Sequence, residues 1–247
     1  MRKKQFLVYF ILPLVLIIFV QIINGPSFLY NSKPTTSFRG LASVELFEAF
    51  EVDEGSLREL DITRNKAFRV PTLQMYPNYF TGDILTVTTD KNRICLDCNG
   101  GIELGEVVAF KSPKDNITIG FGRVMGLPGD KIRMAKKELF INEKKEILIG
   151  LLNGNKKIND IKFDYLKSFI KGITYVVVQD PKKEAEISKL SMVIPKDQLF
   201  IIGDNRDYSV DSRTLGSISL ANIVGIEIGM SNETRTEKTL SRLRPKD

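Results

Sequence analysis

The chain has 247 residues, of which 43% are apolar and 27% charged, and its formal net charge is +6. This balance is typical of a globular protein with a core rather than of a disordered chain. The sequence contains no histidine, which excludes Ser-His-Asp triads, Cys-His dyads and histidine-ligated metals. It also shows no basic stripe with interleaved aromatic residues. We therefore expect no nucleic-acid partner, no metal and no other cofactor.

The N-terminus has the pattern of a membrane anchor. Three basic residues at 2–4 precede the uncharged stretch QFLVYFILPLVLIIFVQIIN, and twenty helical residues span about 30 Å, the thickness of bilayer hydrocarbon. A cleaved signal peptide is the alternative, but no small-residue cleavage site follows. We predict an uncleaved anchor over 1–24, with membrane lipid as a partner. The basic residues predict a cytoplasmic N-terminus, a single pass through the plasma (inner) membrane and an ectodomain outside the cytoplasm.

The next segment, 25–66, is expected to be juxtamembrane. Apolar and acidic residues each recur at three-residue steps between Val44 and Glu51. This spacing predicts a short acidic amphipathic helix.

From Phe68 onward the sequence favours strands, with β-branched runs and alternating apolar positions. The stretches with this character are 83–89, 105–110, 116–126, 138–142, 174–180, 188–205 and 220–229. We predict a mainly β ectodomain with a core formed by 67–130 and 195–230. Residues 131–194 would form a smaller β cap or insertion, and 231–247 a solvated or frayed tail.

Cys95 and Cys98 form the motif CLDC in a polar loop. Zinc would need four ligands, and a catalytic redox pair normally opens a helix, which the following residues do not favour. We expect a loop disulfide in an oxidising compartment, with free thiols as the alternative.

Three segments carry a family resemblance. They are PTLQMYPNYFTGD at 71–83, RVMGLPGDKI at 123–132 and GDNRDYSVDSR at 203–213. In this order and spacing they resemble the type I signal peptidases of bacteria, which are membrane-anchored serine endopeptidases that trim signal peptides from exported preproteins. The resemblance covers 67–230, with a gap over 134–190.

The resemblance implies a reaction in which a serine attacks the scissile carbonyl and a neutral lysine is its base. A hydroxyl two residues before the serine would stabilise the oxyanion together with a backbone N–H. In this chain the nucleophile position is Gln74 and the lysine position is Gly122. Thr72 keeps the oxyanion hydroxyl, and the groove positions Met75 and Pro77 match the family. The retained supporting residues are Gly203, Asp204, Asn205, Ser209, Asp211 and Arg213.

The absent Ser/Lys dyad predicts an inactive homologue that keeps the frame of the enzyme. Such a frame could still bind an exported preprotein or signal peptide as an added β-strand, or act on an active signal peptidase paralogue. One alternative is an active divergent peptidase with a relocated pair, for which Thr72 and Lys111 are candidates. The other is a non-enzymatic structural membrane protein.

Three local expectations accompany this reading. Gly120 and Gly122 would leave one strand face bare, with the Gln74 amide folded over it. In the structural alternative for the third segment, GDNRD would be a polar loop with Asp204 paired to Arg206, and Asp211 with Arg213 would be an ion pair without a mechanistic role. Met75, Tyr79 and Phe80 would belong either to the core or to a lipid-contacting surface.

Overall fold

The computed structural model describes residues 64–151, 157–158, 160–185, 189–228 and 232–243. The chain divides into two compact units, 1–41 and 42–247, and every described residue belongs to the second. The predicted anchor and the predicted acidic helix lie outside the described residues. Among the helices that are described, none is both long and apolar enough to cross a bilayer.

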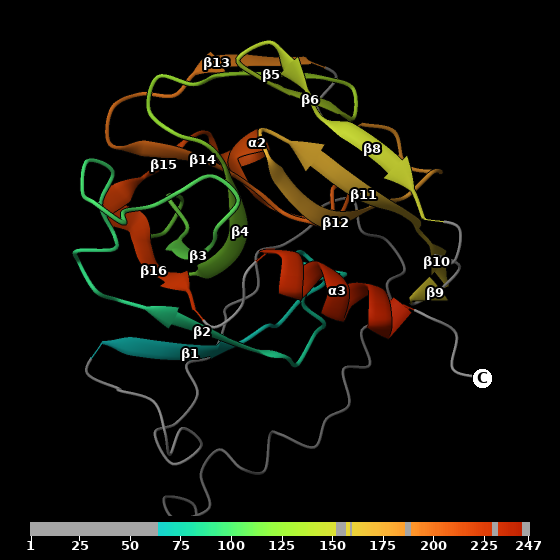
Figure 1. Cartoon of the computed structure of the whole chain (residues 1–247), viewed down its shortest axis with the longest axis horizontal. Helices are drawn as coiled ribbons and strands as arrows, with labels where there is room; N and C mark the ends of the chain where they lie inside the picture. The colour runs from blue at the N-terminus through green and yellow to red at the C-terminus, as the bar shows by residue number, and fades with distance from the viewer. Residues whose placement is uncertain (1–63, 152–156, 159, 186–188, 229–231, 244–247) are drawn as a thin grey trace, which may run out of the picture. The chain divides into compact units, whose positions relative to one another are not determined.

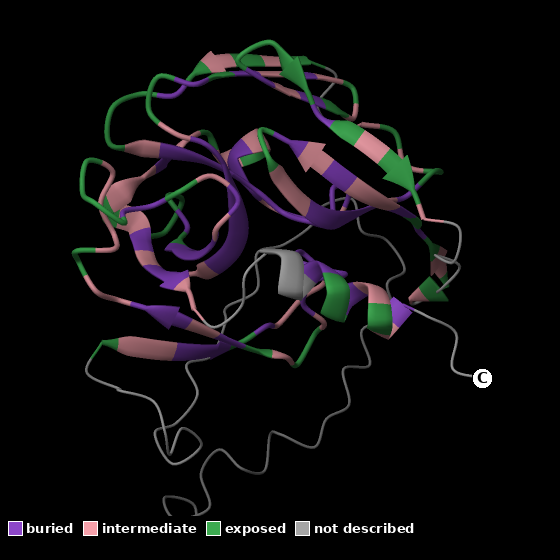
Figure 2. Ribbon diagram, in the orientation of Figure 1, coloured by how far each residue is buried: buried purple, intermediate pink, exposed green. Residues whose placement is uncertain are grey.

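A seven-stranded sheet, antiparallel in every pairing, forms the larger part of the fold. Its strands, in spatial order, are β1 (Asn65–Arg69), β2 (Ile84–Thr88), β16 (Ile223–Glu227), β3 (Val107–Lys111), β4 (Ile119–Gly126), β14 (Gln198–Ile202) and β15 (Ile218–Ser219). The sheet curls on itself, so that β3, β4 and β16 surround an interior that is mostly buried (Figures 1 and 2). The mainly β class predicted from the sequence is confirmed.

Smaller sheets follow in the segment expected to form the cap. One contains β12 (Ile173–Gln179), β11 (Asp164–Ile170) and β8 (Ile147–Gly150), and another contains β13 (Lys189–Val193), β5 (Lys131–Ala135), β6 (Glu138–Ile141) and β7 (Lys144–Lys145). A two-stranded ribbon joins β9 (Lys157–Ile158) to β10 (Ile161–Lys162). Short helical turns, α2 (Ser212–Leu215) and η3 (Leu220–Asn222), flank β15.

Strand β4 lies between β3 and β14 in the sheet and shows how alternation divides the core. Val124 belongs to a cluster with Phe110 and Ile201, whereas Phe121 and Met125 on the other face join two separate clusters. Successive side chains of a strand point to opposite faces, so one strand serves several packing layers. Ile117, predicted to begin this strand, is 69% exposed and precedes it in a loop.

The predicted frayed tail is wrong. Residues 232–243 form the helix α3 (Asn232–Leu243), which lies against β12 (Figure 1). Thr236, Thr239 and Leu243 are buried at helical spacing. The polar composition hid this helix because, between residues 236 and 243, two of the three buried positions are threonines, which an apolar pattern does not count.

Candidate functional site

The loop 71–83 is closed at its base and packed onto the sheets. The Val70 N–H donates to the Asp83 carbonyl at 2.8 Å, and the Gly82 N–H donates to the Val70 carbonyl at 2.8 Å. Within the loop closed by these two hydrogen bonds, Gln74 is only 4% exposed, and Met75 and Tyr76 are fully buried. The loop therefore does not present its central side chain to solvent.

Aromatic and apolar residues of the loop account for this packing. Tyr76 contacts Phe163 and Tyr165, and the two tyrosine hydroxyls lie 2.6 Å apart. Met75 and Tyr79 belong to the cluster that contains Phe121. Burial of Met75 and Tyr79 supports the core reading of these residues over lipid contact. Pro77, also buried, follows Tyr76 through a cis peptide bond.

The two groups expected to stabilise an oxyanion lie together. The backbone N–H of Gln74 points to Thr72 Oγ1 at 3.4 Å. The Gln74 carbonyl accepts a hydrogen bond of 3.1 Å from the backbone N–H of Asn205. The first and third family segments thus meet through the backbone at residue 74, whatever side chain it carries.

Glycines on the neighbouring strands fit closely under this loop. A Cβ atom at Gly203 would lie 2.7 Å from the Gln74 carbonyl oxygen and would overlap Ser209. The register pairs Arg123 with Ile202, and a Cβ atom at Gly122 would meet Ile201 and the Ile202 carbonyl. The position expected for a basic lysine therefore lies against the strand residues that directly precede Gly203.

The expected bare face at Gly120 and Gly122 is wrong. A Cβ at Gly120 would lie 2.9 Å from the Phe110 ring, and one at Gly122 would overlap the branch methyl Cγ2 of Ile201. Apolar side chains already occupy both spaces. Gln74 instead packs its backbone oxygen over Gly203.

Arg123 carries the strongest interaction between the segments. Its guanidinium donates two hydrogen bonds to Asp204, at 2.8 and 2.6 Å, and both side chains are fully buried. Burial opposes the charge on Arg123, but the Asp204 carboxylate outweighs it and the pKa of Arg123 is raised. Arg123 is therefore a fixed cation and cannot act as a base.

The expected ion pair between Asp204 and Arg206 is also wrong. Arg206 donates two hydrogen bonds to Glu146, at 2.9 and 2.6 Å. Glu146 is buried and directly precedes β8. The Tyr175 ring lies 4.4 Å from the Arg123 guanidinium and 5.9 Å from that of Arg206. The two buried ion pairs, Arg123–Asp204 and Arg206–Glu146, thus both lie beside the Tyr175 ring.

Asp211 organises the segment 203–213. Its carboxylate accepts from the Gly203 N–H at 2.8 Å, the Ser209 hydroxyl at 2.6 Å and the Arg213 guanidinium at 2.7 Å. Burial opposes the charge on Asp211, but Arg213 and these hydrogen bonds hold its pKa below the usual value. The structure thus pairs Asp211 with Arg213, and Asp211 also caps α2.

Sequence reasoning missed Asn78, which joins four parts of the chain. Its side-chain amide donates to the Val176 carbonyl and to Asp204, each at 2.7 Å, and accepts from the Thr239 hydroxyl at 3.0 Å. Arg242 of α3 also pairs with Asp83 at 2.8 Å. No local pattern marks Asn78, because each of its partners lies about 100 residues or more away.

Two groups predicted from the sequence remain, the Asn205 side chain and the cysteine pair. The Asn205 side chain is fully buried, and neither its oxygen nor its nitrogen has a hydrogen-bond partner among the described residues. In the polar loop before β3, a disulfide joins Cys95 to Cys98. Across the described part of the chain, no three acidic or cysteine side chains converge as metal ligands would.

Comparison with known proteins identifies the family. The profile of the family described as signal peptidase, peptidase S26, matches residues 61–229, more than half of the chain. Signal peptidase I of Rickettsia typhi is 28% identical over 191 residues, covering 73% of this chain and 70% of that protein. Signal peptidase I of Buchnera aphidicola subsp. Schizaphis graminum is 27% identical over 229 residues, covering 72% of each.

A solved structure is also similar. The crystal structure of a signal peptidase I from Enterococcus faecalis matches 51% of this chain and 95% of its own, at 20% identity and a TM-score of 0.30. The match to the family profile covers all three motif segments and the sheet that carries them. The chain therefore belongs to the signal peptidase family, peptidase S26.

Proposed function

We propose that this protein is a signal peptidase homologue that has kept the frame of the enzyme and does not cleave preproteins. The single observation that carries the proposal is the state of the two dyad positions. Position 74 holds a buried glutamine, and position 122 holds a glycine whose side-chain space is occupied by Ile201. Neither a nucleophile nor a base stands where the family chemistry needs them.

The relocated pair considered from the sequence receives no support from the geometry. Thr72 Oγ1 faces the N–H of Gln74. Lys111 is exposed at the end of β3, whereas the family reaction needs a buried lysine as its base. Arg123 is held by Asp204. A threonine without a neutral amine nearby is a weak nucleophile.

The retained parts favour binding of an exported polypeptide by the frame. In support, Thr72 and the Gln74 N–H lie side by side, and backbone recognition of an added strand needs neither serine nor lysine. We place the chain at the plasma membrane, held by the apolar segment 1–24, where exported preproteins or an active signal peptidase could meet it.

The structure shapes the experiment that tests this proposal. Gln74→Ser with Gly122→Lys alone would drive the new lysine Cβ into the Ile201 branch methyl. Ile201→Leu removes that methyl and keeps the apolar volume. The triple variant Gln74→Ser/Gly122→Lys/Ile201→Leu is therefore the appropriate restoration of the dyad.

The full chain in membranes would be incubated with a preprotein and the release of mature protein measured. We expect no cleavage by the wild type and measurable cleavage by the triple variant. The matched control, Gln74→Ala/Gly122→Lys/Ile201→Leu, has the same substitutions apart from the nucleophile and should be inactive. Cleavage by the wild type at a rate near that of a working signal peptidase would overturn the proposal.

Binding needs a separate readout. A signal-peptide sequence carrying a photoreactive group should crosslink to the wild type near residues 72–77. A full chain that neither cleaves nor crosslinks would instead support the structural alternative named from the sequence.

A further inference from the structure

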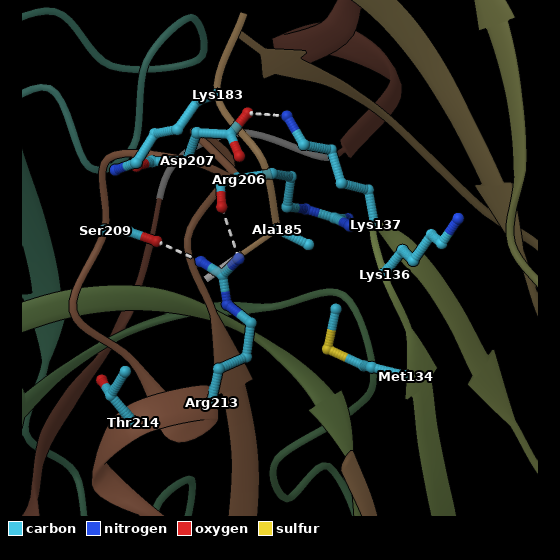
Figure 3. A pocket seen from close by; sticks show the side chains of 10 residues that line it. All are labelled: Met134, Lys136, Lys137, Lys183, Ala185, Arg206, Asp207, Ser209, Arg213 and Thr214. Carbon is cyan, nitrogen blue, oxygen red and sulfur yellow. Dashed lines mark hydrogen bonds and ion pairs between the residues drawn. The ribbon is translucent and has the colours of Figure 1, made fainter. Parts of the chain in front are cut away.

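A pocket outside the loop 71–83 has an unusual lining. It lies between the β5–β6 hairpin, the residues after β12 and the segment 203–214 (Figure 3). Its lining residues are Met134, Lys136, Lys137, Lys183, Ala185, Arg206, Asp207, Ser209, Arg213 and Thr214. Five of these are cations and one is a carboxylate, so the lining has a strong excess of positive charge.

The one carboxylate in the lining is already engaged. Asp207 Oδ2 accepts from Lys137 Nζ at 2.8 Å and from the backbone N–H of Asp180 at 2.7 Å. Figure 3 shows the ends of Lys137 and Lys183 on either side of this carboxylate. The hydroxyls are engaged too, since Ser209 donates to Asp211 and Thr214 donates to the Asp211 carbonyl.

Several donors of the pocket, in contrast, remain unused. A lysine ammonium has three N–H donors. Lys183 Nζ uses one on the Asp207 carbonyl, and Lys137 Nζ uses two, on Asp207 and on the Asp180 carbonyl. Lys136 is exposed and makes no hydrogen bond or ion pair within the described part of the chain. A ligand for this pocket must therefore supply acceptors.

An independent observation comes from Arg206, which is 4% exposed. Its two terminal nitrogens bind Glu146 and Tyr175, but its Nε–H is buried without a partner in the described residues. A buried N–H without an acceptor is unfavourable, and native proteins rarely leave one unpaired. Arg206 lines the pocket, so an acceptor bound there could satisfy this donor.

We propose that this pocket binds a small oxyanion of the phosphate class, with Lys136, Lys137, Lys183 and Arg206 as its donors. The cavity volume of about 30 Å³ is enough for a few water-sized atoms, which suits one phosphate group rather than a nucleotide. Phosphate oxygens form strong charge-assisted hydrogen bonds with lysine and arginine. The ligand could be free phosphate or the headgroup of a membrane lipid.

Such a ligand would act on the motif segment 203–213. Arg206 and Arg213 both line the pocket and are linked by a hydrogen bond from the Arg213 guanidinium to the Arg206 carbonyl. Arg213 also holds Ser209 and Asp211. The bound oxyanion would therefore stabilise the support beneath Gln74, and this inference holds whether or not the chain cleaves preproteins.

The test measures binding of inorganic phosphate to the full chain in detergent by titration calorimetry, with chloride as the competing salt. The pocket variant is Lys136→Gln/Lys183→Gln, which leaves the Lys137–Asp207 pair in place. The matched control is Lys144→Gln/Lys162→Gln, two exposed lysines outside the pocket. Both variants lose two positive charges, so a general charge effect is the same in each.

We expect saturable binding to the wild type and the control, and a dissociation constant raised about tenfold or more in the pocket variant, because two charged donors are lost. A second arm uses vesicles of phosphatidic acid with phosphatidylcholine vesicles as reference. Binding to phosphatidic acid alone, lost in the pocket variant and kept in the control, would identify a lipid headgroup as the source. Equal binding by both variants, or no saturable binding in either arm, would overturn the proposal.

Discussion

Arg123 and Asp204 illustrate, at the scale of single residues, what the shared motifs do in this chain. Both side chains are fully buried, and Asp204 also accepts from Asn78. Desolvating two charges is costly, and that cost is offset only while both partners and their hydrogen bonds remain. The pair therefore acts as a structural unit of the fold, whether or not the chain carries out the family reaction.

The change Asp204→Asn tests this role. It leaves the Arg123 charge buried without a counter-ion, so we expect it to lower the free energy of unfolding by about 3–5 kcal/mol. Urea unfolding of the full chain would measure the loss. The matched control Asp164→Asn removes an exposed charge and should stay within about 0.5 kcal/mol of wild type. A loss no larger than the control's would contradict the structural role.

Residue-scale features were only partly predictable. The motif spacing predicts that Thr72, Gln74 and Gly122 hold the oxyanion, nucleophile and base positions, and this assignment stays a prediction. It did not predict that Asp204 would pair with Arg123, 81 positions away, rather than with the nearby Arg206. Partner choice among charged residues depends on where strands bring them in space, which local spacing does not contain.

At the scale of elements, helix α3 fastens the loop 71–83. Thr239 donates to Asn78, Arg242 pairs with Asp83, and the Arg242 guanidinium lies 5.0 Å from the Phe80 ring. The loop is thus held from the C-terminal helix as well as from the sheets. The burial of this loop therefore depends on contacts with α3, which lies far from it in the sequence.

Weakening this attachment should loosen the loop. We expect the double variant Thr239→Val/Arg242→Gln to speed amide hydrogen exchange across 71–83 by about tenfold, because a charged and a neutral hydrogen bond are lost. Lys238→Gln, an exposed change on the same helix, is the control for the loss of charge. Exchange in the loop that is unchanged from the control would show that α3 does not hold it.

Strands were easier to predict than this helix for a physical reason. The β4 segment begins with alternating large and small residues, and its run of buried residues on both faces is typical of a core strand. Helix α3 buries two threonines, whose hydroxyls bond to the Thr174 carbonyl and to Asn78. Only a periodicity that counts threonine at 236 and 239 with Leu243 would have predicted it.

At the scale of the whole molecule, the seven-stranded sheet and the sheet of β8, β11 and β12 are joined through the motif segment. The Val178 N–H donates to the Asp204 carbonyl at 3.1 Å, and the Arg206 N–H donates to the Val178 carbonyl at 3.0 Å. Strand β12 is thereby bonded to the segment that follows β14. The buried charges of both sheets lie close to this junction, so their ionisation affects the whole described fold.

Stability should therefore depend on pH in the acid range. Glu146 and Asp211 are buried, which alone would raise their pKa values, but Arg206 and Arg213 hold both pKa values below normal. A depressed pKa stabilises the fold fully above the unfolded values of about 4, and that stability is lost as pH falls through the folded pKa values. We expect thermal unfolding temperatures that are steady near pH 6 and drop below about pH 4.

The variant Glu146→Gln tests whether the Glu146 carboxylate contributes to this pH dependence. It should be less stable than wild type at pH 7, since Arg206 loses its counter-ion, and its stability should fall less steeply below about pH 4. Thermal unfolding followed by circular dichroism across pH 3–7 would measure both. Parallel acid profiles for wild type and variant would show that Glu146 carries no proton-linked stability.

The burial of the Arg123–Asp204 pair has a consequence for how such chains are recognised. Removing either partner leaves a buried charge uncompensated, so the fold itself requires this pair whether or not a reaction uses it. Similarity at these positions therefore reports the architecture of the fold and does not measure catalysis. Family membership and catalysis therefore need separate evidence. The first can be judged from Arg123 and Asp204, and the second must be assayed with changes at positions 74 and 122.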